Sequence, residues 1–429
     1  MNKSRESKRA AWRWKWKEEY TDALLFAIIW LGFSVVTLML FYRQAGAGAD
    51  KMYESDMKAY MLEMQGLDSG YSFPYPVFFK LSALIHLFVS PEWAVSLATM
   101  LLNSFGVLLM KLQLNRMFVT AWEQRAGGKK WLVGLGLSLL AVSLFLISMV
   151  YPPYRITLPG IRHRYTGVFT ANPFHNATYM AARPFAILSF FQFGKLLDEY
   201  EKGYSGSWKE SERGVALRDY VLFALYLLLA TMTKPSFTTV LVGAAGLLMV
   251  YRMVKNKFRT FVPTVQLGVC FIPTFLDLLY QYKGVFVPTG EEAERGIGFG
   301  VGKVWAHYCD NIPLAICLAI GFPLLVLLLN YKEWMKNTLY RFSWQIYLCG
   351  FAYALLLYEK GFRKVDFNFS WGYMYGIFFA FVGALLVLLK ATVKKEKPLL
   401  LTLQWLAYLA HLVCGLLYFV HIFQGGAYY

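Results

Sequence analysis

The chain has 429 residues, of which 57% are hydrophobic and 16% charged, and its mean hydropathy is +0.42. This composition excludes a soluble globular domain and indicates a polytopic membrane protein. The net charge of +17 does not indicate a nucleic-acid partner, because the lysines and arginines lie in short clusters between apolar runs. There they set the topology and contact anionic membrane lipids.

Residues 1–20 are basic and rich in tryptophan, which predicts a segment along the cytoplasmic membrane interface. The first apolar run follows at 23–42. It is too long for the hydrophobic region of a signal peptide, and no clear cleavage site follows it, so we expect a retained first span. Residues 21–429 are then expected to form one transmembrane domain.

The loop at 43–91 separates the first span from the second and is expected to be the outer catalytic loop. It carries two acids around one serine, Glu54 and Asp56, and then an amphipathic segment. After a break rich in glycine and proline, Tyr75-Pro76 begins a second amphipathic segment, so we expect two juxtamembrane helices. Carboxylates directly after a span suit a general base or a cation ligand, and the alternative is a solvated loop without a role.

The next polar loop, at 152–176, gathers hydrogen-bond donors. Arg162, His163 and Arg164 stand in a row, and His175 lies near the end of the loop. Arginine offers a bidentate fork and histidine changes charge near neutral pH, so this loop predicts a clamp for a phosphate or pyrophosphate. The alternative is an ordinary basic loop that anchors the chain at the interface.

An arginine lies about one turn inside the span expected at 178–197. A charge at this depth needs a partner or a water-filled cavity. Arg183 therefore predicts a substrate-phosphate ligand, a structural ion pair with an acid such as Asp277 or Glu359, or a side chain that snorkels to the interface.

The sequence Thr233-Lys234-Pro235-Ser236 separates two apolar runs at 220–232 and 237–251. Because proline removes a helix donor, this sequence predicts a tight hairpin at the far face of the membrane. Lys234 at its tip would hold a lipid phosphate as a point charge, and the alternative is an exposed loop lysine.

Eleven apolar runs predict an all-α fold of about eleven transmembrane helices. With the N-terminus in the cytoplasm, 28 of the 43 lysines and arginines fall on the cytoplasmic side, as the positive-inside rule requires. The polar loops and Lys234 then share the outer face of the cell membrane. The runs are 23–42, 94–110, 131–151, 178–197, 220–232, 237–251, 261–280, 312–329, 342–358, 371–389 and 400–423.

Cysteine and histidine spacing does not point to a protein-bound transition metal. The five cysteines form no Cys-x-x-Cys pair, and no His-Glu-x-x-His sequence is present. These patterns predict neither a disulfide framework nor a zinc site. If Glu54 and Asp56 bind an ion, Mg²⁺ or Mn²⁺ suits their oxygen ligands.

The first part of the chain resembles the type C glycosyltransferases, polytopic enzymes of the GT-C fold that use sugars linked to polyprenyl phosphate. The resemblance rests on the acidic pair after the first span, the amphipathic segment, Tyr75-Pro76, and the span that follows, SPEWAVSLATMLLNSFGVLLMKLQLNRMF. It covers about 23–118. The stretches HNATYMAARPF and TKPSF are similar to those of a bacterial subgroup.

This resemblance implies that Asp56 is the catalytic acid of the first outer loop, with Glu54 as its neighbour. The expected reaction moves a sugar from a polyprenyl-phosphate donor to a hydroxyl of a glycan or lipid-linked acceptor, with inversion at the anomeric carbon, in the synthesis of a cell-envelope polysaccharide. Tyr75 and His175 would contact the substrate, and Arg183, Lys234 and 162–164 would hold its phosphate. A polysaccharide polymerase or ligase, a transporter or flippase of a lipid-linked anion, and a non-catalytic scaffold remain alternatives.

Overall fold

The computed structural model describes residues 2–48, 52–123, 130–151, 158–161, 164–204, 215–286, 296–394 and 397–428. This part of the chain is nearly all helical, as expected. The long helices are α1 (Asn2–Ala45), α4 (Pro91–Glu123), α5 (Lys130–Ser143), α7 (Ala177–Tyr204), α9 (Leu217–Thr233), α10 (Ser236–Lys255), α12 (Ile272–Phe286), α14 (Ile312–Leu329), α16 (Thr338–Leu356), α17 (Ser370–Lys394) and α18 (Pro398–Phe423).

Six helices of the described residues are long and apolar enough to cross a membrane. They are Tyr20–Ala45, Pro91–Val119, Ser236–Lys255, Ile312–Leu329, Ser370–Lys394 and Pro398–Phe423. A seventh span would be α11 (Phe261–Val269) taken together with α12, although the two are bent by 51° at a short break. The sequence predicted about eleven spans. The other expected runs do form helices, α5, α7, α9 and α16, but these are shorter or less apolar.

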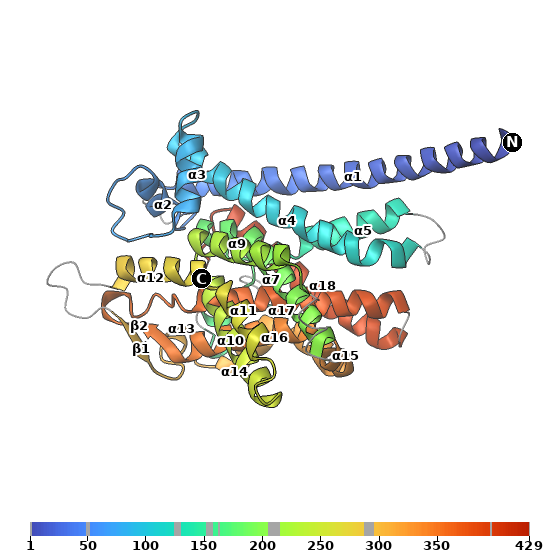
Figure 1. The fold of residues 1–429 in the computed structure, drawn as a ribbon. Coiled ribbons are helices and arrows are strands. Elements are labelled where there is room, and N and C mark those ends of the chain that lie inside the picture. The colour runs from blue at the N-terminus through green and yellow to red at the C-terminus, as the bar shows by residue number, and fades with distance from the viewer. Residues whose placement is uncertain are drawn as a thin grey trace.

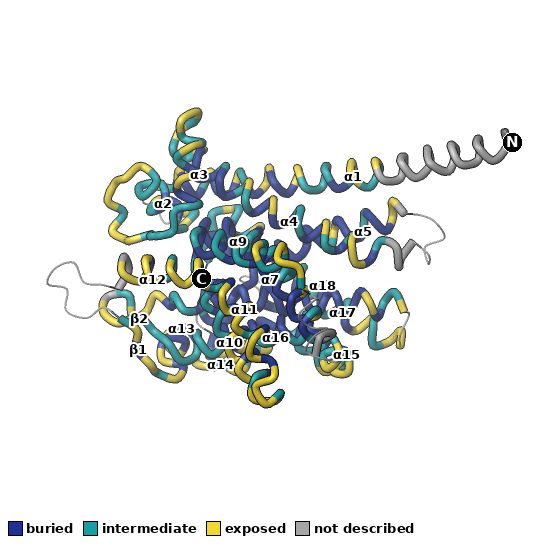
Figure 2. Tube along the Cα trace, in the orientation of Figure 1, coloured by how far each residue is buried: buried dark blue, intermediate teal, exposed yellow. Residues whose placement is uncertain are grey.

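Helix α17 is the centre of the bundle. Every residue from 372 to 389 is buried, and the helix is apolar all round, which is the pattern of a helix surrounded by other helices. Its neighbour α16 lies close because glycines face its backbone: a Cβ atom at Gly376 would lie 2.8 Å from the Cα of Tyr347. Figure 2 shows the buried centre and the more exposed α1 at the edge.

The loop after α1 forms the two short helices that the sequence predicted. Helix α2 (Met57–Met64) begins directly after Asp56, and α3 (Pro76–His86) begins with Tyr75 as its N-cap residue and Pro76 at its first position. Proline is favoured there because the first N–H of a helix has no partner. The remaining short helices are α6 (Arg164–Val168), α13 (Trp305–Tyr308), α15 (Tyr331–Lys336) and η1 (Gly361–Arg363).

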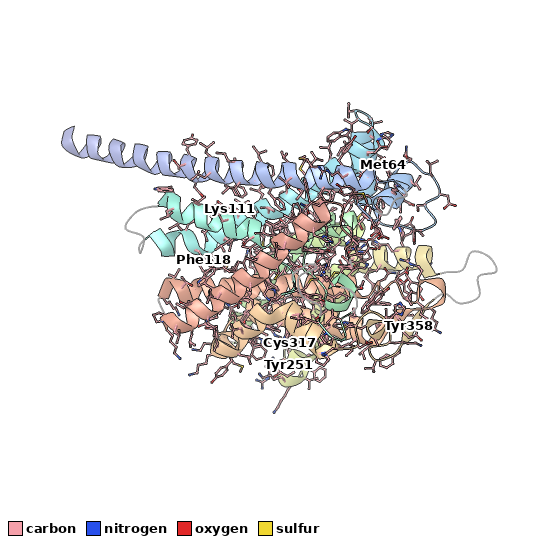
Figure 3. The ribbon with its side chains drawn as sticks, turned by 180° about the vertical axis from the view of Figure 1, so that it is seen from behind. Met64, Lys111, Phe118, Tyr251, Cys317 and Tyr358 are labelled. Atoms are coloured by element: carbon pink, nitrogen blue, oxygen red, sulfur yellow. The ribbon has the colours of Figure 1, made fainter. Side chains whose placement is uncertain are left out.

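One feature was not predicted: a small antiparallel pair of strands, β1 (Ile297–Phe299) and β2 (Leu357–Glu359). The pair lies at the same end of the bundle as α2 and α3, and the last residues of the described chain lie there too (Figure 1). Seen from behind, Met64 and Tyr358 lie toward this end, while Phe118 lies at the other (Figure 3). Loops that the sequence assigned to one membrane face are therefore at one end of the bundle.

Candidate functional site

Four segments that are distant in sequence meet at the α2–α3 end of the bundle. Asp56 precedes α2, Asn176 precedes α7, Lys234 separates α9 from α10, and Trp371 lies in the first turn of α17. The helices that these residues begin or end are all labelled in Figure 1. The packing of the bundle thus gathers polar side chains at its helix ends, where loops are free to carry them.

Asn176 connects the acid and the lysine directly. Its Nδ2 donates to Oδ2 of Asp56 at 2.5 Å, and its Oδ1 accepts from Nζ of Lys234 at 3.2 Å. The same Oδ1 also accepts from the backbone N–H of Tyr179 at 2.9 Å, which fixes the direction of the amide. Asn176 is 2% exposed, so one buried amide joins a carboxylate to an ammonium group.

Two hydroxyl groups complete the network. Tyr60 donates to Oδ2 of Asp56 at 3.4 Å and accepts from Nδ2 of Asn176 at 2.9 Å. Thr178 accepts from Nζ of Lys234 at 3.1 Å, and its Oγ1 lies 3.1 Å from the Tyr60 hydroxyl. A buried polar group that lacks a partner costs about 1–3 kcal/mol, so these hydrogen bonds stabilise the arrangement of the side chains.

The surroundings shift both charged groups toward their neutral forms. Burial raises the pKa of Asp56, and the charge of Lys234, the hydrogen bonds from Asn176 and Tyr60, and the charge of Arg363 oppose that rise. Burial lowers the pKa of Lys234 to about 8, against the charge of Asp56. A carboxylate whose pKa is raised is a stronger base, and perturbed groups of this kind are typical of functional sites.

The local sequence explains why Lys234 points into the site. The residue before a proline avoids the helical region, and Lys234 is extended, with φ −166° and ψ 124°. Helix α9 therefore ends at Thr233 and α10 begins at Ser236, which confirms the predicted break. Lys234 is 6% exposed, so it is not the exposed loop lysine of the alternative interpretation.

Aromatic rings surround the ammonium group. Nζ of Lys234 lies 4.8 Å from the ring centre of Trp371 and 5.9 Å from that of Tyr75. The Tyr179 ring lies 5.7 Å from that of Trp371. Tyr75, a residue expected to contact the substrate, is therefore placed beside the lysine by the first turn of α3.

His175 is buried at the edge of this cluster. Its backbone carbonyl accepts a hydrogen bond from the N–H of Asp56 at 3.1 Å, and its ring lies 5.7 Å from that of Trp371. Burial, together with the charge of Lys234, lowers the pKa of His175 to about 3, so the imidazole is neutral at physiological pH. The histidine thus lies beside the site without contributing a charge to it.

Arg183, which the sequence suggested as a ligand of the substrate phosphate, is surrounded by other side chains of the bundle. It is 0% exposed, and its guanidinium donates to Oδ1 of Asn172 at 2.7 Å and to the carbonyl of Ala171 at 3.2 Å. It also lies over the rings of Phe145 and Phe378, at 4.9 and 5.2 Å. The guanidinium is therefore enclosed by protein, and we do not assign it to the substrate.

The two ion pairs suggested for Arg183 are not formed. Asp277 accepts instead from Nε2 of Gln281 at 2.8 Å, and Glu359 pairs with Arg363 at 3.3 Å. Arg183 is held instead by amide and carbonyl oxygens and by aromatic faces, and its Nε has no hydrogen-bond partner among the described residues.

The remaining predicted site residues are Arg162, His163, Arg164 and Glu54. Arg162 and His163 lie outside the described residues. Arg164 begins α6, and its guanidinium lies 5.5 Å from the ring centre of Tyr151. Glu54 is exposed, whereas Asp56 is half-buried and hydrogen-bonded to Asn176, so the two neighbouring acids have different surroundings.

The described residues hold no group of three or more histidine, cysteine, aspartate or glutamate side chains arranged for a metal ion. No family model, curated protein or solved structure matches the chain. The assignment of a function therefore rests on the site itself.

Sequence reasoning did not identify several residues of the network: Tyr60, Asn176, Thr178 and Trp371. The sequence Asn176-Ala177-Thr178 matches a glycosylation sequon, and that match gave no sign of a buried hydrogen-bond network. A signal was nevertheless present, because both polar residues lie at the start of a helix that leads directly into the membrane domain. Polar side chains there must find partners.

Proposed function

We propose that the protein is an integral membrane glycosyltransferase that moves a sugar from a polyprenyl-phosphate donor to an acceptor hydroxyl. The observation that carries the proposal is the Asn176 bridge between Asp56 and Lys234. An acid and a cation separated by one amide can address two parts of one substrate, the attacking hydroxyl and the departing phosphate. The resemblance of the first outer loop to type C glycosyltransferases supports the same reaction.

In the proposed reaction Asp56 is the general base. The acceptor hydroxyl loses its proton to the carboxylate of Asp56 while its oxygen attacks the anomeric carbon of the donor. The bond between that carbon and the phosphate oxygen breaks, and the polyprenyl phosphate leaves with the electron pair, which inverts the configuration. Lys234 stabilises the negative charge that develops on this phosphate.

Arg363 is a second cation for the phosphate. It follows β2, pairs with Glu359 and Asp366, and its charge lowers the pKa values of both Asp56 and Lys234. It comes from a loop on the expected outer face. In this proposal Arg363 takes the place that the sequence suggested for Arg183.

The departing phosphate is already an anion matched by fixed cations, so the proposed reaction does not depend on a metal. If the active protein uses one, Mg²⁺ or Mn²⁺ would suit the oxygen ligands of the substrate phosphate and Asp56. The acceptor is proposed to be a glycan or lipid-linked sugar at the outer face of the cell membrane.

A transporter or flippase of a lipid-linked anion is the second candidate, because the break between α11 and α12 is a feature of transporters. Their half-helices surround a substrate near the middle of the membrane. The two candidates differ in the fate of the lipid-linked sugar, since a transporter moves it across a proteoliposome membrane without consuming it.

Mass spectrometry of lipid-linked sugars in cells lacking the gene tests the proposal and identifies the donor. We expect a polyprenyl-linked sugar to accumulate, and we expect wild-type protein to remove it. Asp56→Asn should leave the accumulation unchanged at equal expression because it removes the base. Glu54→Gln is the matched control, since Glu54 is exposed two residues away, and it should behave as wild type. Full complementation by Asp56→Asn would refute the assignment.

A further inference from the structure

The chain turns back toward the site after α18. Gly425 has φ +88°, a conformation that favours glycine, and a Cβ atom there would lie 2.8 Å from Cε of Met52. A Cβ atom at Gly426 would collide with the imidazole of His421, whose Nε2 lies 3.0 Å from the carbonyl oxygen of Ala427. Two glycines thus allow the turn to pack tightly against its own helix and against the loop that leads to Asp56.

The end of α18 also holds the end of α1. Arg43 donates from Nη1 to the carbonyl of Phe423 at 2.8 Å, and its guanidinium lies 4.4 Å from the centre of the Phe423 ring. The same guanidinium lies 5.8 Å from the ring of Tyr53. The last turn of α18 therefore contacts the end of α1, and Arg43 links this contact to Tyr53.

Tyr428 completes this set of contacts. Its ring stacks on that of His175, with centres 4.0 Å apart and planes 5° from parallel. The ring of Tyr165 stands edge-on to both, at 4.4 Å from His175 and 5.5 Å from Tyr428. His175 in turn accepts the hydrogen bond from the backbone N–H of Asp56.

We propose that the segment Gln424–Tyr428 is a strap that fixes the position of Asp56, and that Tyr428 is a positioning residue which acts through His175. The strap holds the Asp56 loop at two places, at Met52 and Tyr53 on its entering side and through His175 at Asp56 itself. Only the catalytic consequence of the strap rests on the proposed glycosyltransferase activity.

Hydrogen exchange of the full-length protein in lipid nanodiscs tests the strap without an activity assay. Tyr428→Ala should speed exchange in peptides covering 52–60 by about tenfold, because it removes both the stacking on His175 and the area that the ring buries. Tyr428→Phe keeps the ring and should exchange within about twofold of wild type. Peptides of α14 should be unchanged in both variants. Unchanged exchange at 52–60 in Tyr428→Ala would overturn the proposal.

Gly426→Ala provides a second route, because it displaces the turn but keeps Tyr428. It should speed exchange at 52–60 as Tyr428→Ala does, and the proposal fails if it does not. If Tyr428→Ala does not fold, exchange in Gly426→Ala tests the strap.

Sugar transfer then tests the catalytic consequence. Tyr428→Ala should lower kcat with little change in the KM for donor, since Lys234 is held by Asn176 and Thr178, and Tyr428→Phe should restore kcat. An increase in kcat in Tyr428→Ala would overturn the positioning role, because it would show that Tyr428 obstructs the site. If exchange changes as expected but no transfer occurs even in the wild type, the strap stands and the proposed function fails.

Discussion

Lys234 and Asp56 are the two charged residues on which the proposed chemistry depends, and burial shifts the pKa of each toward the neutral form. Burial lowers the pKa of Lys234 to about 8, so this lysine can change its charge near physiological pH. Asp56, whose pKa burial raises, binds protons more readily than an exposed aspartate. Their hydrogen bonds to a single asparagine keep the two groups in a fixed relation.

The titration of Lys234 leads to a pH prediction. Its charged form binds the donor phosphate and is lost as the pH rises through about 8, so the KM for donor should increase above that pH. Lys234→Arg keeps its charge in this range, and the increase should move to higher pH. The measurement is the KM for donor as a function of pH in both proteins. If the KM for donor increases at the same pH in the wild type and in Lys234→Arg, Lys234 is not the phosphate ligand.

The sequence located some residues of the site and could not locate others. Asp56 and Lys234 stand out because a charge beside an apolar run needs a reason to be there. Asn176 and Thr178 do not, since neutral polar residues near a helix start are common. The environment of Arg183 also could not be foreseen, because its partner Asn172 and the rings above it are brought together only by tertiary packing.

At the scale of elements, the close contact of α16 and α17 sets the centre of the bundle. Gly350 and Gly376 each face the backbone of the other helix, and a Cβ at Gly350 would lie 2.8 Å from the carbonyl oxygen of Gly372. Small residues at such positions let helix backbones approach closely in membrane proteins. Helix α17 also supplies Trp371 at its start, so the position of α17 affects the site.

Gly376→Ala should destabilise the protein by about 1–3 kcal/mol, because the added methyl group meets the backbone of Tyr347 and the helices must move apart. Gly246→Ala is the matched control, as it lies on α10 with open space around its Cβ position. That change should be neutral or slightly stabilising. Thermal unfolding in detergent measures both, and equal unfolding temperatures would show that the α16–α17 contact is not tight.

Elements with a strong local signal were predictable from the sequence. The break before Pro235 and the helix start at Pro76 follow from the chemistry of proline, and both are present. The pairing of β1 with β2 was not predictable, because it joins two three-residue segments about sixty residues apart. The number of spans was also uncertain, since helices such as α7 and α16 are buried by other helices and need not be apolar enough to face lipid.

At the scale of the whole molecule, the bundle has two distinct ends. The end with α2, α3, β1 and β2 carries the candidate site, and the end of α17 and the start of α18 lie at the other (Figure 1). The excess of lysine and arginine predicts that the site end faces away from the cytoplasm.

Cysteine labelling in intact cells tests this orientation. Glu54→Cys should react with a membrane-impermeant maleimide, because Glu54 is exposed at the site end. Lys332→Cys in α15 is the matched control, exposed in a segment expected in the cytoplasm, and should react only after the cells are opened. The wild-type chain, with its own five cysteines, sets the background. The opposite pattern would place the site in the cytoplasm.

The central claim is that Asp56 accepts a proton from the acceptor at a site whose phosphate is held by Lys234. The most direct measurement is sugar transfer by purified protein in nanodiscs, with the donor identified by mass spectrometry, alongside donor binding measured separately. We expect Asp56→Asn to bind donor as the wild type does but to lose transfer by at least about 100-fold, the smallest typical contribution of a general base. Transfer by Asp56→Asn at the wild-type rate would contradict the account.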